Sequence, residues 1–119
     1  MTADELKQRT KTFGIRTVKV VEKLPAKRSA ATIGQQLLRC GTSVGANYRA
    51  ACKAQSSKAF TSKLSIAFEE MDESLFWLEV INELKLLGAK KLELITKEAD
   101  ELTRILASSR KTVQKKLLK

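Results

Sequence analysis

The stretch "RCGTSVGANYRAAC", residues 39–52, places Gly41 and Gly45 four residues apart in a segment whose flanks have helical periodicity. A glycine inside a helix costs roughly 1 kcal/mol relative to alanine, so each of these glycines needs a compensating role. A phosphate-binding loop is excluded, because the stretch lacks both the lysine of the GxxxxGK[ST] motif and a preceding strand. We interpret the glycines as a small helix edge that lets another backbone approach closely. The spacing leaves open whether that backbone belongs to the same chain or to another protomer.

Outward from this stretch, apolar or small residues recur every three or four positions along four segments of the chain. Pro25 is expected to end the first helix, Ser56 or Ser57 to cap the third, and Gly88 to follow it in the left-handed conformation. The connections are short and no internal repeat is visible, which predicts an all-α, antiparallel up-and-down four-helix bundle. We expect one domain over residues 1–119 with a frayed basic C-terminal tail and helices at about residues 4–23, 29–53, 58–87 and 90–116.

The formal net charge of +10 is unevenly distributed along the chain. Residues 1–63 carry 13 basic and 3 acidic side chains, residues 64–103 carry 4 and 10, and residues 104–119 carry 6 and none. Such asymmetry indicates either a polyanionic partner or complementary faces between protomers.

The basic residues are the main candidates for a binding surface. At 100° per residue, Arg28, Arg39 and Lys53 fall opposite the apolar stripe of the second helix, and Arg49 lies at their flank. The tail adds a second group of cations. No aromatic residues are interleaved with them, so we expect contacts to a nucleic-acid backbone rather than base reading. An ordinary solvated face is the alternative. The predicted nucleic-acid-binding residues are Arg28, Arg39, Arg49, Lys53, Arg110, Lys111, Lys115 and Lys116.

Catalytic chemistry is hard to build from this sequence. The chain has no histidine, and its two cysteines, Cys40 and Cys52, fit neither a zinc nor a redox pattern, so we expect them to be reduced and buried. Glu69 and Glu73 share one helix face and have the spacing of a Mg²⁺ pair, but a solvated or salt-bridged face is commoner. We therefore predict no catalytic residues, no metal and no cofactor.

Two further residues are predicted to serve helix packing or oligomerisation together with Gly41 and Gly45. Asn47 lies one turn after Ser43, and the pair is expected either to hydrogen-bond across a close helix contact or to face water. Trp77 is expected in the core or at a subunit interface, with base stacking as the alternative. The charged N-terminus is unlike a secretory signal and no segment has the length of a membrane span, so we expect a cytoplasmic protein.

Residues 36–84, and within them "GTSVGANY" (41–48), "KLSIAF" (63–68) and "WLEV" (77–80), resemble the bacterial four-helix-bundle proteins of 23S rRNA gene intervening sequences. The accessory protein of diversity-generating retroelements, which partners a reverse transcriptase, shares that fold family. The resemblance implies a ring-shaped homo-oligomer, a homopentamer in known relatives, and an association with RNA or an RNA-handling enzyme. Many relatives carry an acidic residue shortly after the asparagine, where this chain has Arg49, Ala50 and Ala51.

Three hypotheses follow from the sequence. The first is a homo-oligomeric bundle that presents basic surface to RNA or DNA, beside ribosomal RNA or a reverse transcriptase. The second is a protein–protein scaffold in which the basic half of one protomer meets the acidic surface of the next. The third and weakest is a metal-dependent enzyme that uses Glu69 and Glu73.

Overall fold

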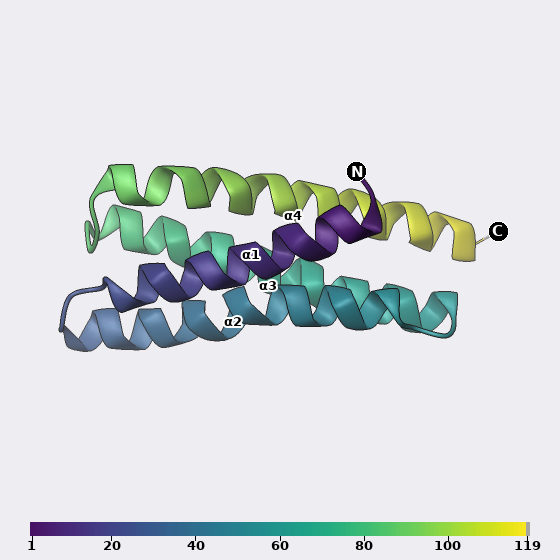
Figure 1. Ribbon diagram of the computed structural model, residues 1–119, viewed down its shortest axis with the longest axis horizontal. Coiled ribbons are helices and arrows are strands. Elements are labelled where there is room, and N and C mark those ends of the chain that lie inside the picture. The colour runs from purple at the N-terminus through teal and green to yellow at the C-terminus, as the bar shows by residue number, and fades with distance from the viewer. Residues whose placement is uncertain (119) are drawn as a thin grey trace.

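The computed structural model describes residues 1–118, and four long helices make up nearly all of them (Figure 1). Successive helices run in opposite directions, and together they form a rod with extents of 50 × 22 × 20 Å. The predicted antiparallel four-helix bundle is thereby confirmed. The helices are α1 (Ala3–Glu22), α2 (Arg28–Cys52), α3 (Ser57–Glu83) and α4 (Ala89–Leu117).

Two of the four helices, α1 and α3, begin with a side-chain cap. Thr2 Oγ1 accepts a hydrogen bond from the backbone N–H of Glu5, and Ser56 Oγ accepts one from the N–H of Ala59. Each hydroxyl satisfies one of the amide groups that the first helical turn leaves without a partner. Ser56, one of the two residues predicted for this position, is therefore the N-cap of α3.

The end of α3 differs from the expectation. The predicted helix extended to residue 87, whereas α3 ends at Glu83. Lys85, with a φ of 55°, takes the left-handed conformation that was assigned to Gly88, and Gly88 (φ −64°) instead precedes α4 as its N-cap. The N–H groups of Lys85 and Leu86 bond to the carbonyls of Asn82 and Ile81, which is the Schellman arrangement. The prediction was wrong because glycine is the commonest residue in the left-handed position after a helix, but other residues also adopt it.

The core is a continuous seam of apolar side chains at alternating three- and four-residue spacing. This spacing averages 3.5 residues per turn, the repeat of left-handed coiled-coil packing. In α2 the buried positions run from Ala30 to Ala51 without interruption, and Gly41 lies on this seam. Leu37, Val44, Leu64, Met71, Leu78, Leu102 and Leu106 are completely inaccessible to solvent.

At three glycines, α1 and α2 approach each other closely. A Cβ atom on Gly45 would lie 3.1–3.2 Å from backbone atoms of Thr10 and Lys11, and one on Gly14 would lie 3.3 Å from the carbonyl oxygen of Gly41. A Cβ atom on Gly41 would lie 2.5 Å from Thr17 Cγ2. The alternative left open by the spacing is resolved, since the neighbours of both glycines belong to α1 of the same chain. Backbone atoms of Thr10 and Lys11 lie against Gly45, and the side chain of Thr17 lies against Gly41.

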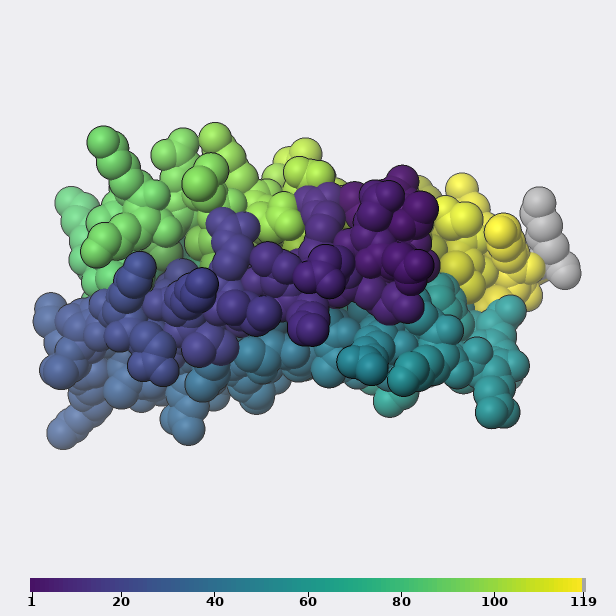
Figure 2. Space-filling model, viewed as in Figure 1, coloured from purple at the N-terminus to yellow at the C-terminus, as the bar shows by residue number. Residues whose placement is uncertain are grey.

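Helix α1 crosses the front of the molecule from α2 to α4 (Figures 1 and 2). It packs along α2 and meets α4 mainly near its own N-terminal end, where Arg9 forms a bidentate pair with Glu98 at 2.6 and 3.1 Å. Glu101 lies 3.1 Å from the same guanidinium. Within residues 1–118, no helix combines the length and apolar character needed to cross a membrane.

Candidate nucleic-acid interface

One end of the bundle gathers cations from three helices. The α2–α3 turn and the C-terminal part of α4 lie at the same end of the rod (Figure 1). They enclose a hollow of about 450 Å³ lined by residues of the turn, Phe60, Val113, Lys116 and Leu117. We call this region the basic end and define it by Lys53, Lys58, Arg110, Lys111, Lys115 and Lys116.

The basic end contains no acidic side chain from its own segments. Residues 49–68 and residues 102–118 include no aspartate or glutamate. None of the six cations forms an ion pair with a described residue; the Arg110 guanidinium instead lies 4.2 Å above the ring centre of Phe68. Their charges are left uncompensated within the described chain, so an anionic partner meets a strong positive potential there.

The predicted binding residues do not form one continuous row. Lys53 and the four tail cations meet at the basic end, whereas Arg28 lies at the opposite end, in the first turn of α2. Lys58 was missed by the sequence analysis, although the absence of acids over residues 49–68 is a signal that was visible.

Arg49 and Lys53 also line a groove between α1 and α2. This α1–α2 groove has a volume of about 640 Å³, and Lys7 and Lys11 lie on its other side. Lys7 and Lys11 were likewise missed, because their proximity to α2 depends on the helix packing. The lining of the α1–α2 groove includes Lys7, Lys11, Gly14, Ile15, Val18, Gly45, Ala46, Arg49 and Lys53.

A smaller group of cations lies toward the other end of the rod. Arg16, Lys19 and Lys23 of α1 and Lys91 of α4 surround a hollow of about 160 Å³ that also contacts Val20, Leu87 and Ile95. The sequence analysis did not single out these residues, which come from two helices far apart in the chain. Four cations gather here, against six at the basic end.

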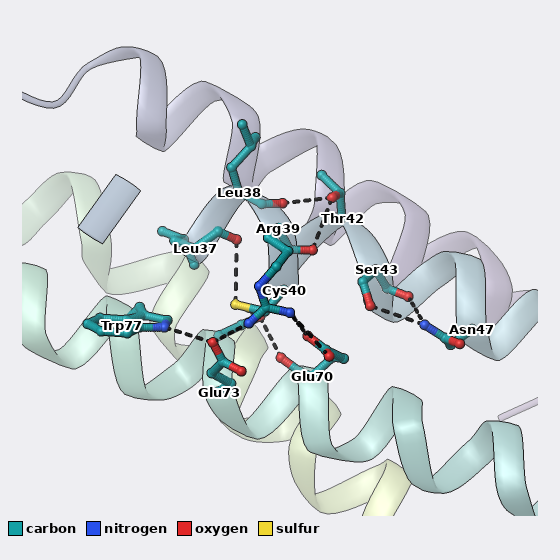
Figure 3. A network of polar contacts seen from close by, with 11 residues as sticks. Leu37, Leu38, Arg39, Cys40, Thr42, Ser43, Asn47, Glu70, Glu73 and Trp77 are labelled. Atoms are coloured by element: carbon teal, nitrogen blue, oxygen red, sulfur yellow. Dashed lines mark hydrogen bonds and ion pairs between the residues drawn. The ribbon is translucent and has the colours of Figure 1, made fainter. Parts of the chain in front are cut away.

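Arg39 belongs to a polar network on the α2–α3 face (Figure 3). Its guanidinium reaches across to Glu70 at 3.0 Å and to Glu73, and Glu73 also accepts a hydrogen bond of 3.0 Å from Trp77 Nε1. Arg39 is half exposed, but two carboxylates compensate its charge. It therefore joins α2 to α3 and differs from the unpaired cations of the basic end.

The network also sets the ionisation of Glu73. Partial burial opposes the charged form, but hydrogen bonds from Trp77 and Arg39 and the positive charge of Arg39 outweigh it, so the pKa of Glu73 is lowered. Both donors bind Oε2 of Glu73, so this carboxylate links Arg39 of α2 to Trp77 of α3. Among residues 1–118, no group of three or more histidine, cysteine, aspartate or glutamate side chains is placed to hold a metal ion.

We predict that the fluorescence of Trp77, the only tryptophan, changes as Glu73 is protonated. Folding lowers this pKa, so the ionised carboxylate of Glu73 stabilises the fold at pH values above the pKa that it has in the unfolded chain. That stabilisation is lost as the pH falls through the pKa of Glu73 in the folded protein. The emission midpoint should lie below the ordinary value of 4.5. Glu73→Gln keeps an acceptor for the indole and should abolish the transition. A midpoint above 4.5, or the same transition in the variant, would contradict the assignment.

The remaining predicted packing residues lie on the same two helices. The Asn47 side-chain amide donates to the backbone carbonyl and the hydroxyl of Ser43, at 3.0 and 3.1 Å, so its hydrogen bonds remain inside α2. Trp77 is half-buried against the core, with its ring edge-on to Phe76. Both cysteines are free; Cys40 is buried as expected, and burial raises its thiol pKa, but Cys52 is only half-buried.

The comparisons with known proteins agree with this fold. The family model described as "23S rRNA-intervening sequence protein" matches residues 4–108. A crystal structure of a protein of unknown function from the S23 ribosomal protein family of Bacteroides thetaiotaomicron VPI-5482 is 32% identical, with a TM-score of 0.84. The alignment covers 93% of this chain and 99% of the other. No curated protein matches significantly. The chain therefore belongs to the family of 23S rRNA-intervening sequence proteins.

Proposed function

We propose that this protein is a non-enzymatic, homo-oligomeric helical bundle that binds RNA or DNA through the phosphate backbone. The observation that carries the proposal is the basic end, where six cations from three helices lie together without an acidic partner. Each cation that neutralises a phosphate releases condensed counterions, which drives association at low salt. The family membership supports an RNA-related setting.

The aromatic residues near the basic end favour backbone contacts over base reading. Phe60 and Phe68 are both packed against the core, and Arg110 covers the ring of Phe68. Sequence-specific RNA modules instead offer exposed aromatic rings on which unpaired bases stack. We therefore expect little preference among sequences.

The test is a salt titration of binding to a labelled 20-base-pair duplex, made in RNA and DNA versions. If about six phosphates are neutralised, the slope of log K against log salt should be about −5, and affinity should fall about 10³-fold between about 50 and 200 mM salt. Fluorescence anisotropy measures both quantities. Absence of binding at the lowest salt would refute the proposal.

A protein–protein scaffold without a nucleic-acid role is the alternative, and one observation favours it. The segment of α3 between Leu64 and Leu84 carries six acidic and no basic side chains, which complements the basic half of the chain. Under this alternative, salt weakens assembly and RNA does not compete with it.

For the nucleic-acid function, the resemblance implies two settings, beside ribosomal RNA or beside a reverse transcriptase. Co-purification of ribosomal RNA or of a reverse transcriptase with the tagged protein would distinguish these two settings.

A further inference from the structure

The α1–α2 groove is formed by two helices alone. All the residues that line it belong to α1, to α2 or to the C-cap of α2, so neither α3 nor α4 forms any part of it. Its floor is made by Gly14 and Gly45, where the two backbones come close, and by the small side chain of Ala46. Small residues in the floor leave room for a third helix to approach both helices closely.

One half of the groove is cationic. A Cβ atom on Gly45 would lie 3.1 Å from the backbone nitrogen of Lys11. Because α1 and α2 are antiparallel, Arg49, one turn after Gly45, is level with Lys7, one turn before Lys11. Asp4, the acidic residue among the lining, is paired with Lys7 at 3.1 Å. The other three cations of the lining have no ion-pair partner among the described residues: Lys11, Arg49 and Lys53.

The other half of the groove is apolar. Ile15 and Val18 follow Lys11 by one and two turns on the same side of α1, and they are 49% and 36% exposed. On the side of α2, the hydroxyl of Thr42 donates to the carbonyl of Leu38 at 2.7 Å, so it needs no partner in the groove. Leu38 lies one turn before Thr42, beyond the lining residues, and is 37% exposed. The groove therefore changes along its length from cationic to apolar.

This division into two halves selects the chemistry of the occupant. A phosphate backbone carries a charge at every nucleotide and gains nothing from Ile15 and Val18. An acyl chain requires a pocket that encloses most of its surface, whereas the side chain of Ile15 is half exposed. A helix meets both requirements, because apolar residues at three- and four-residue spacing bury Ile15 and Val18 while acidic residues on the same face pair with the cations.

We propose that the α1–α2 groove binds a helix of a different protein, one whose docking face is acidic in one half and apolar in the other. The acidic half lies beside Lys11 and Arg49, and the apolar half lies on Ile15 and Val18. From Asp4 to Val18 the wall formed by α1 is about 21 Å long, which a helix of about 14 residues spans. This interaction goes beyond the nucleic-acid function and does not depend on it, since the tail cations of the basic end lie outside the groove.

The probe is a labelled synthetic peptide of about 18 residues, longer than the groove because short isolated helices are marginally stable. It carries glutamate at every third or fourth position of one half, leucine at the corresponding positions of the other half, and alanine or glutamine elsewhere. Fluorescence anisotropy measures its affinity for the full chain at about 100 mM salt. Replacing the glutamates by glutamine, or the leucines by alanine, should each weaken binding about tenfold or more. Equal binding by either altered peptide would overturn the proposal.

Two variants of the protein alter the groove by independent means. Ala46→Trp fills it without a change of charge, and Lys11→Glu with Arg49→Glu reverses one cation on each side. These positions are exposed, so both variants should fold, which circular dichroism checks, and each should bind the peptide about tenfold more weakly or worse. Lys27→Glu with Lys85→Glu, at the opposite end of the rod, is the matched control. Both double variants have a net charge of +6, since each reversal changes +10 by two, and the control should bind like the wild type. Unchanged binding by a folded groove variant, or an equal loss in the control, would contradict the proposal.

Ala46→Trp also tests the other occupants of the groove. A lower oligomer mass by light scattering would show that a second copy fills the groove, and duplex binding weakened about tenfold would show that nucleic acid fills it; either result overturns the proposal. Lys111→Glu with Lys115→Glu separates the two functions, since it should weaken duplex binding and leave peptide binding intact. In the wild type, duplex binding without peptide binding refutes only this inference, and peptide binding without duplex binding refutes only the nucleic-acid function.

Discussion

Replacing Gly41 with leucine is expected to lower the free energy of unfolding by about 3 kcal/mol or more. A Cβ atom at this position would lie 2.5, 2.7 and 2.9 Å from Cγ2, Oγ1 and Cβ of Thr17. Thr17 is completely buried, its χ1 is stiff because it is β-branched, and its hydroxyl donates to the carbonyl of Phe13 at 2.9 Å. The larger side chain can be accommodated only if α1 moves away from α2.

Thermal unfolding followed by circular dichroism measures this effect. For a chain of this size a loss of about 3 kcal/mol corresponds to a decrease in Tm of about 10 °C or more. Gly88→Ser is the control, because a Cβ atom there meets nothing within 4 Å and serine is a better N-cap. Its Tm should be unchanged or slightly higher.

A second variant identifies Thr17 as the cause. Gly41→Ala should destabilise less than leucine, because it adds only a Cβ atom against Thr17, and replacing glycine inside a helix returns up to about 1 kcal/mol of helix propensity in either variant. Combining it with Thr17→Ala removes Cγ2 and Oγ1, the two atoms nearest to the new Cβ, and leaves only the Thr17 Cβ contact at 2.9 Å, so the double variant should lose less stability than the sum of the single losses. Strict additivity, or an unchanged Tm for Gly41→Leu, would show that α1 does not pack on Gly41.

Reversing Lys111 and Lys115 to glutamate together is expected to weaken duplex binding about 30- to 100-fold at about 100 mM salt. Two phosphate contacts are lost and two repulsions are introduced. The salt slope should also become shallower by about two units, one for each lost contact. Both side chains are exposed on the last turns of α4, so folding should be unaffected.

The matched control is Lys27→Glu with Lys85→Glu, in the turns at the opposite end of the rod. Both double variants reduce the formal net charge from +10 to +6, since each reversal changes it by two. Long-range attraction therefore falls equally, and the control should lose little affinity. Equal losses would show that binding follows net charge alone. A larger loss in Lys19→Glu with Lys23→Glu would place the contact at the smaller basic cluster instead.

The helices were predictable because their signals are local. The seam of buried residues in α2, the break at Pro25 and the cap at Ser56 each depend on a few neighbouring positions. The boundaries were accurate to one residue except at the end of α3 and the start of the turn after it, where Lys85 takes the left-handed conformation. Among the site residues, the acid-free composition of the basic end was also visible in the sequence.

By itself, the sequence determined four amphipathic helices, their order and the small edge at Gly41 and Gly45, because hydrophobic periodicity and side-chain volume are properties of single segments. Only the tertiary structure decided which helix fills that edge and which cations remain unpaired. Arg39 meets carboxylates 31 and 34 residues away, and Lys7 and Lys11 meet α2 through packing. Such contacts depend on which surfaces of the helices pack against each other. Four helices of similar periodicity can pack into a bundle in several ways, so their sequences do not decide between these packings.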